Sequence, residues 1–282
     1  LSNYIRLHTA GLESDYSYLQ TLNAGLSFEE EELKFVKGDI YARNIGVVGY
    51  YLTSLISRKF SLDEFETPEL ERDVVGHDIW GMVKHIHRPN EEFHRYTTWK
   101  ELTSKERKYA NKTAIFSFIN LANPTLFGIK NFELKNGNKL NLNIGYSLSP
   151  FGDYFSQNFY YYIPSKGLKF NPYLIEYFNE KNVFFGGGLK LHNYKIHKNI
   201  IVNSSLDVWS QPKSLSFSTS ESEFGIGGKI NCAYKLYTNN KENNLFIDVS
   251  VSGKTKGFLP EAPSLKNDMR ISFGLIYTID EK

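Results

Sequence analysis

Residues 139–149 read KLNLNIGYSLS, and hydrophobic and polar side chains alternate along this stretch with a period of two. Successive side chains of a β-strand point to opposite sides, so this alternation predicts a strand with one apolar face and one polar face. The apolar side carries Leu140, Leu142, Ile144, Tyr146 and Leu148, and the polar side carries Lys139, Asn141, Asn143, Gly145, Ser147 and Ser149.

The same alternation returns in three later stretches, at residues 224–237, 245–252 and 269–279. Comparable segments between them bring the expected number to about seven or eight strands after Phe132. Asn136-Gly137, just ahead of the first strand, is a favoured pair for a tight hairpin turn. The C-terminal part of the chain is therefore expected to form an antiparallel sheet.

The chain ahead of this sheet divides into two parts. Residues 1–38 are expected to hold N-terminal strands and a linker, because apolar residues alternate again over Tyr16–Phe28. Residues 39–131 are expected to be a helical segment. No Pro-rich or Ser/Gly-rich stretch separates these parts from the strands in residues 132–282, so the sequence predicts one domain.

Three helices are expected within the helical segment, from capping residues and helical spacing. They are residues 39–60, with Asp39 as N-cap; residues 67–88, opened by Thr67 and Pro68 and ended by Pro89; and residues 103–123, opened by the capping box of Thr103 and Glu106 and ended by Asn123 and Pro124.

Composition excludes several classes of protein. Lys and Arg total 33 against 31 Asp and Glu, a net charge of +2 that gives no field for holding a polyanion, so no nucleic-acid partner is expected. A single cysteine, Cys232, excludes an internal disulfide and a multi-cysteine metal site, and no cofactor is predicted. The longest weakly charged window, residues 44–57, is shorter than the roughly 20 residues that a membrane-spanning helix needs.

The environment of the apolar face decides between two kinds of sheet. A soluble sandwich or lipocalin-like barrel turns that face inward, whereas a membrane barrel turns it outward. Strands of roughly ten residues, polar faces rich in Ser, Asn, Gly and Lys, and aromatics near strand ends favour the membrane barrel. These aromatics are Tyr154, Phe155 and Phe159–Tyr162. The chain begins at Leu1 without methionine, so we expect a processed or trimmed form that lacks its export signal.

Residues 270–279, RISFGLIYTI, resemble the closing strand of bacterial outer-membrane β-barrels, which carries a glycine, alternating hydrophobics and an aromatic near the chain end. The chain departs from that pattern because it continues through Asp280, Glu281 and Lys282. The helix, loop and helix that end at Asn123-Pro124 resemble uncharacterised outer-membrane proteins whose helical segments pack with a barrel.

Together, the alternation and the resemblance predict a mainly β fold: an antiparallel up-and-down transmembrane β-barrel of roughly 8–12 strands with a helical insert. They place it in the bacterial outer membrane. Membrane lipid or lipopolysaccharide, and other outer-membrane proteins, are the partners that this location implies.

The second predicted helix carries the candidate site residues. Asp78, Gly81, His85 and Arg88 follow one another at spacings of three and four, so an acid, an imidazole and a guanidinium line one side of the helix beside a gap left by glycine. Such a line can orient a general base, or bind the phosphate or carboxylate of a lipid head group. It can equally be a polar face that bridges to the sheet.

Other catalytic patterns receive less support. Gly-x-Ser-x-Gly and His-Glu-x-x-His are both absent, so a serine or zinc hydrolase has no motif here. A cross-strand His/Ser pair is open to His192 or His197 with Ser204 or Ser205. Residues 186–188, three glycines, follow an apolar strand and lack the lysine of a phosphate loop, so they predict a bend in the wall of a barrel.

Two functional hypotheses therefore remain. The first is a non-enzymatic outer-membrane barrel that acts as a channel, a binding protein or a subunit of an envelope assembly. The second is a hydrolase or transferase of lipid or lipopolysaccharide that uses Asp78 and His85, or a His/Ser pair on the strands.

Overall fold

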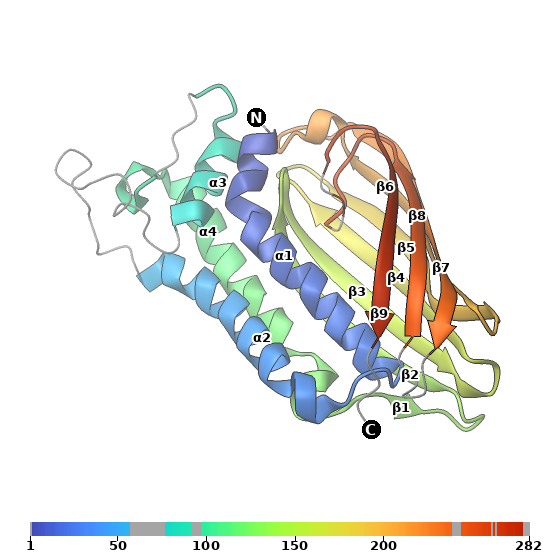
Figure 1. Ribbon diagram of the computed structural model, residues 1–282. Helices are drawn as coiled ribbons and strands as arrows, with labels where there is room; N and C mark the ends of the chain where they lie inside the picture. The colour runs from blue at the N-terminus through green and yellow to red at the C-terminus, as the bar shows by residue number, and fades with distance from the viewer. Residues whose placement is uncertain are drawn as a thin grey trace.

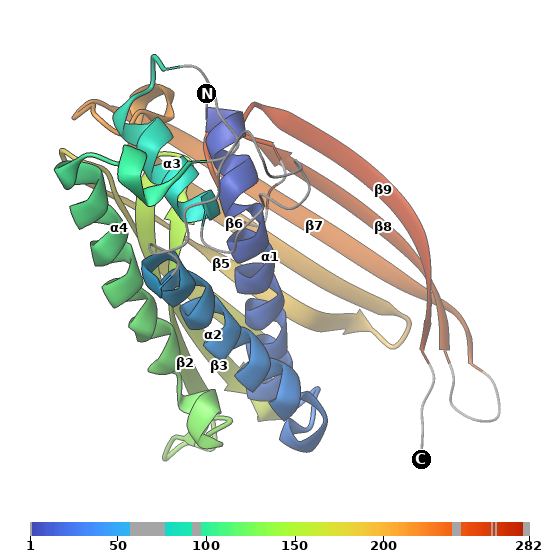
Figure 2. The ribbon, with the colours of Figure 1, turned by 90° about the vertical axis from the view of Figure 1, so that its left-hand side faces the viewer.

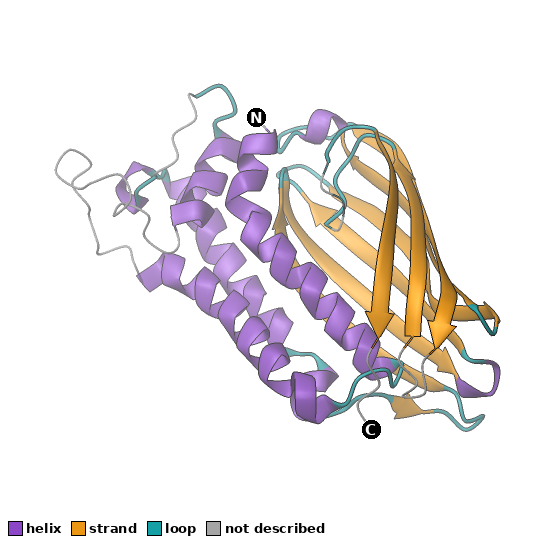
Figure 3. Ribbon diagram, viewed as in Figure 1, coloured by secondary structure: helices purple, strands orange, loops and turns teal. Residues whose placement is uncertain are grey.

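The computed structural model describes residues 2–56, 77–91, 97–238, 244–260, 262 and 264–278, and it combines a curved sheet with a group of helices (Figures 1 and 3). The helices are α1 (Ser2–Ser27), α2 (Leu33–Ile56), α3 (His77–His87) and α4 (Ser104–Phe116), with 3-10 turns η3 (Trp99–Glu101), η4 (Ser117–Leu121), η5 (Pro124–Phe127), η6 (Pro164–Lys166) and η7 (Lys213–Leu215). The strands are β1 (Phe132–Glu133), β2 (Lys139–Ser149), β3 (Gly152–Ile163), β4 (Leu168–Phe178), β5 (Val183–His197), β6 (Ile200–Pro212), β7 (Ser222–Thr238), β8 (Asn244–Lys254) and β9 (Asp268–Thr278).

The nine strands form one sheet in which each strand pairs antiparallel with the next along the chain. This order confirms the predicted mainly β, up-and-down architecture, and β2 has the bounds that the alternation indicates. Gly137, in the turn before β2, has a φ of +76°, a conformation that glycine adopts readily. Among the described residues β9 pairs with β8 alone, so the sheet curves but does not close on itself.

Helix α1 lies along the open side of the curved sheet, between the other helices and the strands (Figures 1 and 2). It packs on β2 and β3 through aromatic contacts, such as that of Tyr16 with Tyr154, and through polar ones. The amide of Gln20 donates to Asn143 Oδ1 at 3.0 Å, and the hydroxyl of Tyr160 donates to Gln20 Oε1 at 2.6 Å. The polar face of these first strands is therefore turned toward a helix.

The strand predicted over Tyr16–Phe28 is wrong, because these residues form the second half of α1. This helix is buried on the sheet side and on the side of α2 and α3, so its buried positions include Leu19, Gln20, Leu22 and Asn23. A helix buried on more than one side loses the simple helical period that an amphipathic surface helix shows.

The other helices follow the prediction in part. Helix α2 begins at Leu33 and carries Asp39 in its interior, where Asp39 accepts a hydrogen bond from Tyr18, so the predicted cap at Asp39 is wrong. The predicted start at Thr67 and Pro68 lies outside the described residues. Helix α4 begins as predicted, since Thr103 Oγ1 accepts from the Glu106 amide at 3.3 Å and the Glu106 carboxylate accepts from the Thr103 amide at 2.7 Å.

Beyond its short pairing with β1, the outer edge of β2 is capped by two asparagines instead of a strand. Asn120 donates its amide to the Tyr146 carbonyl at 3.0 Å and accepts from the Tyr146 N–H at 2.8 Å. Asn123 accepts from the Ile144 N–H at 2.6 Å. The segment after α4 thus supplies three of the hydrogen bonds that a neighbouring strand would make to this edge.

Aromatic side chains fill one end of the curved sheet, near the β8–β9 loop. Tyr154 and Tyr177 are fully buried there with Phe258 of the loop and Trp209. Tyr154 and Tyr160, two of the aromatics expected near strand ends, do lie near the ends of β3, but both are buried inside and add nothing to its outer face.

Glycines make room for these rings. A Cβ added at Gly225 would lie 2.1 Å from Nε1 of Trp209, and one added at Gly188 would lie 2.8 Å from Cε1 of Tyr173. The three glycines of residues 186–188 are therefore needed for close packing of rings and strands in β5, and they make no phosphate loop.

The outer face of β5 to β9 is apolar and exposed. Ile230 and Leu206, on central strands of this half, have 62% and 57% of their surface exposed, and Leu275 on β9 has 71% exposed. Further exposed members are Phe185, Leu189, Val208, Phe224, Ile226, Ile247, Val251, Met269, Ile271 and Phe273. By contrast, Leu142 and Ile144 on β2 are half-buried. No helix within the described ranges is long and apolar enough to cross a membrane.

Candidate functional site

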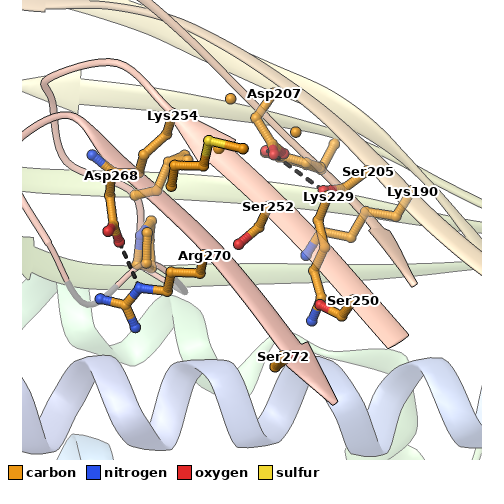
Figure 4. A pocket seen from close by; sticks show the side chains of 18 of the residues that line it. Lys190, Ser205, Asp207, Lys229, Ser250, Ser252, Lys254, Asp268, Arg270 and Ser272 are labelled. Atoms are coloured by element: carbon orange, nitrogen blue, oxygen red, sulfur yellow. Dashed lines mark hydrogen bonds and ion pairs between the residues drawn. The ribbon is translucent and has the colours of Figure 1, made fainter. Parts of the chain in front are cut away.

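A cavity of about 710 Å³ lies on the concave side of the sheet. Its walls are residues of β3 to β9, most of them on the inner face, together with Tyr16 of α1 and Leu259, Pro260 and Ala262 of the β8–β9 loop. Its size falls within the roughly 300–1,000 Å³ of small-molecule sites. The lining side chains are drawn in Figure 4.

Strand register places five polar residues of the cavity in one line across the sheet. Lys190 on β5 lies opposite Ser205 on β6, which in turn lies opposite Lys229 on β7. Lys229 lies opposite Ser252 on β8, which lies opposite Arg270 on β9. We call these five residues the cationic row; cations and hydroxyls alternate along it (Figure 4).

The spacing of the cationic row follows from sheet geometry. Neighbouring strands lie about 4.8 Å apart, so successive cations start about 10 Å apart at the backbone. Lysine and arginine side chains are long and flexible enough for two neighbours to reach one small group between them, where a serine hydroxyl is also available as a donor. The row therefore offers hydrogen-bond donors along its whole length.

The line of residues next to the cationic row, on the side of the β8–β9 loop, carries the acids. It contains Asp207 on β6, Lys254 on β8 and Asp268 on β9. Asp207 is buried and accepts hydrogen bonds from the hydroxyls of Tyr173 and Ser205. The hydroxyls of Tyr173 and Ser205 therefore hold the Asp207 carboxylate in a fixed position at the cavity wall.

Lys254 holds the β8–β9 loop in place. Its Nζ donates to the backbone carbonyls of Thr255, Gly257 and Lys266 at 3.0, 2.9 and 3.2 Å. These contacts tie the β8–β9 loop over one end of the cavity.

The three cations of the cationic row have different surroundings. Arg270 donates its Nε to Asp268 at 2.7 Å, which leaves the two terminal nitrogens of the guanidinium directed elsewhere. Lys190 lies 5.3 Å from the centre of the Tyr173 ring. Lys229 makes no hydrogen bond or ion pair to any residue that the structure describes. With four cations against two carboxylates, the lining carries a net of two positive charges, which suits an anionic ligand.

The predicted line on α3 is divided among different partners. Asp78 accepts from the Tyr50 hydroxyl at 2.7 Å and lies 3.0 Å from Nδ1 of His8. The His8 ring fills the space beside Gly81, where an added Cβ would lie 2.7 Å from its Cε1, and stacks 6.2 Å from the His85 ring.

Arg88, the last member of that line, binds the carboxylate of Glu106 on α4. Its Nε and Nη2 each lie 2.7 Å from the Glu106 carboxylate, and Nη2 also donates to the Glu101 carbonyl at 2.9 Å. The structure thus brings Asp78 to His8 and Arg88 to α4. None of Asp78, His85 and Arg88 lines the cavity.

The candidate histidines and serines of the strands have the following surroundings. His197 lies opposite Ile200 at the β5–β6 hairpin, and the His192 ring packs 5.1 Å from Phe28. Ser205 belongs to the cationic row and donates to Asp207. Within the described part of the chain, no cluster of three or more His, Cys, Asp or Glu could hold a metal ion.

Comparison with known protein families, with curated proteins and with solved structures gives no match.

Sequence reasoning missed the cationic row. Alternation does assign Lys229 and Arg270 to the polar side of their strands. The missing step is strand register, because a shift of two residues in any hairpin would move a lysine away from its neighbours. A lysine or arginine at the middle of the polar face in three alternate strands was the available signal.

Proposed function

We propose that this chain is an integral outer-membrane protein that binds an anionic ligand in the polar interior of an open barrel. The observation that carries the proposal is the inverted half of the sheet: over β5 to β9, apolar side chains are exposed on the outer face, and charged and polar side chains line the cavity on the inner face. Water-soluble antiparallel sheets do the reverse and pack their apolar face on a core. Soluble monomers also rarely expose a contiguous apolar surface of this kind.

The edges of the sheet support the same proposal. In hydrocarbon, an unpaired strand edge costs several kcal/mol for each unsatisfied group. On the edge of β2, Asn120 and Asn123 satisfy the Ile144 N–H and both backbone groups of Tyr146. The edge of β9 borders the cavity, where water or a polar ligand can satisfy it.

The interior favours binding over conduction. Helix α1 lies along the open side of the sheet, and the β8–β9 loop inserts Phe258 at one end of the interior, where it is fully buried. Gln211 fixes this loop, because its side chain donates to the Phe258 carbonyl at 2.6 Å and accepts from the Phe258 N–H at 2.8 Å. A cavity with a fixed cover at one end is suited to holding a ligand.

Two neighbouring residues on β9 test the membrane part of the proposal. Phe273 is on the outer face with 76% of its surface exposed, and Gly274 is on the inner face with no atom nearer than 4.0 Å to an added Cβ. Phe273→Lys should impair insertion into lipid bilayers, since a lysine on the lipid face costs about 2–4 kcal/mol near the midplane. Gly274→Lys should insert like wild type.

The measurement is the fraction of protein that resists alkaline extraction from bilayers after refolding. Equal insertion of the two variants would contradict the proposal, and so would wild-type protein that stays in the aqueous fraction.

A further inference from the structure

The cavity reaches the free edge of the sheet at β9. Its lining includes five consecutive residues of that strand, Asp268 to Ser272. Among the described residues β9 pairs with β8 alone, so no strand lies beyond it. The cavity therefore ends at an edge strand, and this edge is the lateral opening of the sheet.

The cationic row ends at this opening. It begins inside with Lys190 on β5 and ends with Arg270 on the edge strand, and both Lys229 and Arg270 are exposed. An anionic group that passes the edge of β9 meets the Arg270 guanidinium first, then the Ser252 hydroxyl, then the Lys229 ammonium. The polar path thus leads from the open edge into the cavity.

The outer face of the same strand is apolar over its whole length. Met269, Ile271, Phe273, Leu275 and Tyr277 each have more than half of their surface exposed. A few ångströms therefore separate a row of cations and hydroxyls from a continuous apolar strip, with only the backbone of β9 between them. This juxtaposition matches a molecule that has one anionic end and one hydrocarbon end.

We infer that the ligand is an anionic lipid, held with its phosphate on the cationic row and with its hydrocarbon chain across the free edge of β9 onto the outer apolar strip. This inference rests on the proposed function and names its ligand. Phosphate oxygens accept charge-assisted hydrogen bonds from Lys229 and Arg270, and head-group oxygens satisfy the unpaired backbone edge of β9. The chain remains in the hydrocarbon of the bilayer, so only the head group enters the cavity.

Lipid retention by the full chain in detergent micelles tests the inference, with native mass spectrometry as the readout. The probes are phosphatidylglycerol, which is anionic; phosphatidylcholine, which is zwitterionic; and glycerol phosphate, which has no hydrocarbon chain. Wild type should retain phosphatidylglycerol well above the other two. Retention of glycerol phosphate as strong as that of phosphatidylglycerol would overturn the lipid assignment, and equal retention of phosphatidylcholine would overturn the role of the cations.

Matched variants localise the site. Lys229→Gln and Arg270→Gln should each weaken phosphatidylglycerol binding roughly tenfold, the effect of losing one hydrogen bond between charged groups. Lys198→Gln, the same charge change at the exposed β5–β6 turn, should bind like wild type. Unchanged binding in Lys229→Gln and Arg270→Gln, with near-native circular dichroism, would overturn the site.

The apolar strip has its own variant. Phe273→Ser should weaken phosphatidylglycerol binding in micelles and leave the weak binding of glycerol phosphate unchanged. Equal binding of the lipid to Phe273→Ser and wild type would overturn the path across β9. Because these measurements use micelles, they fail or succeed independently of bilayer insertion, which tests the proposed function.

Discussion

At the scale of single residues, the contact between His8 and Gly81 shows what a local reading of sequence can and cannot find. The spacing of Asp78, Gly81 and His85 correctly indicates a gap on one side of α3. The group that fills the gap is the imidazole of His8, which comes from α1. His8 lies 70 positions away from Asp78 in the chain. The local sequence pattern around Asp78 therefore could not predict this partner.

Gly81→Leu should destabilise the protein, because the new side chain must displace the His8 ring from Asp78. Overpacking of this kind costs about 1–3 kcal/mol. Gly46→Leu on α2 is the matched control, since nothing lies within 4 Å of its added Cβ, and leucine favours a helix by up to about 1 kcal/mol over glycine. Thermal unfolding should show a lower melting temperature for the first variant only. A drop of equal size in both would mean that His8 does not occupy this gap.

The pair of Arg88 and Glu106 predicts a dependence of stability on pH. Burial raises the pKa of the Glu106 carboxyl, but hydrogen bonds from Arg88 and the Thr103 amide outweigh it and hold the pKa below the ordinary 4.5. A carboxyl with a lowered pKa in the folded state stabilises the fold above its ordinary pKa, and this contribution is lost as pH falls through the folded-state pKa.

Glu106→Gln should therefore lose about 1–3 kcal/mol of unfolding free energy at neutral pH. The difference from wild type should shrink in acid, below the ordinary carboxyl pKa. Glu221→Gln, which removes the exposed partner of Lys213, should leave stability nearly unchanged at both pH values. Denaturant unfolding of the three proteins at neutral and acid pH checks this; a pH-independent deficit in Glu106→Gln would contradict it.

At the scale of elements, the sequence predicted the strands, but it predicted neither helix α1 nor the register between strands. β2, β7, β8 and β9 follow from alternation because a face of uniform character repeats every second residue along each of them. Helix α1 was mistaken for a strand because it is buried on more than one side. The cationic row depends on register across five strands, and register is set by hairpins and bulges, such as the one between Leu191 and Tyr194.

The asparagine cap on β2 gives a prediction for an element edge. Asn120→Ala leaves both the N–H and the carbonyl of Tyr146 without their partner in a buried place. Such a loss costs about 1–3 kcal/mol for each group. Asn120→Asp keeps the acceptor for the Tyr146 N–H but turns a buried carboxylate oxygen toward the Tyr146 carbonyl. We expect both variants to have a lower unfolding free energy than wild type; identical values for Asn120→Ala and wild type would show that the edge is not capped in this way.

At the scale of the whole molecule, one helix explains why the sheet stays open. The strands β2 to β9 would make a closed barrel of about eight strands, whose interior has room only for its own side chains or one small ligand. Helix α1 lies along the open side of the curved sheet and bonds to β2 and β3 through Gln20, so it occupies the side on which β9 would have to approach β2. The opening at β9 is consistent with that arrangement, and so is the lateral access that we propose for a lipid.

The measurement that tests the central claim most directly is the accessibility of spin labels on the two faces of the sheet, in protein reconstituted into bilayers. Cys232, the single cysteine, is first replaced by alanine, and one label is then placed at Ile230 or Leu275 on the outer face, or at Ser272 on the inner face. Our proposal predicts that the outer labels collide with oxygen dissolved in lipid and are shielded from a water-soluble nickel complex, whereas the label at Ser272 is reached by the nickel complex. Free access of the nickel complex to Ile230 and Leu275, with shielding at Ser272, would contradict the inverted sheet and the membrane location derived from it.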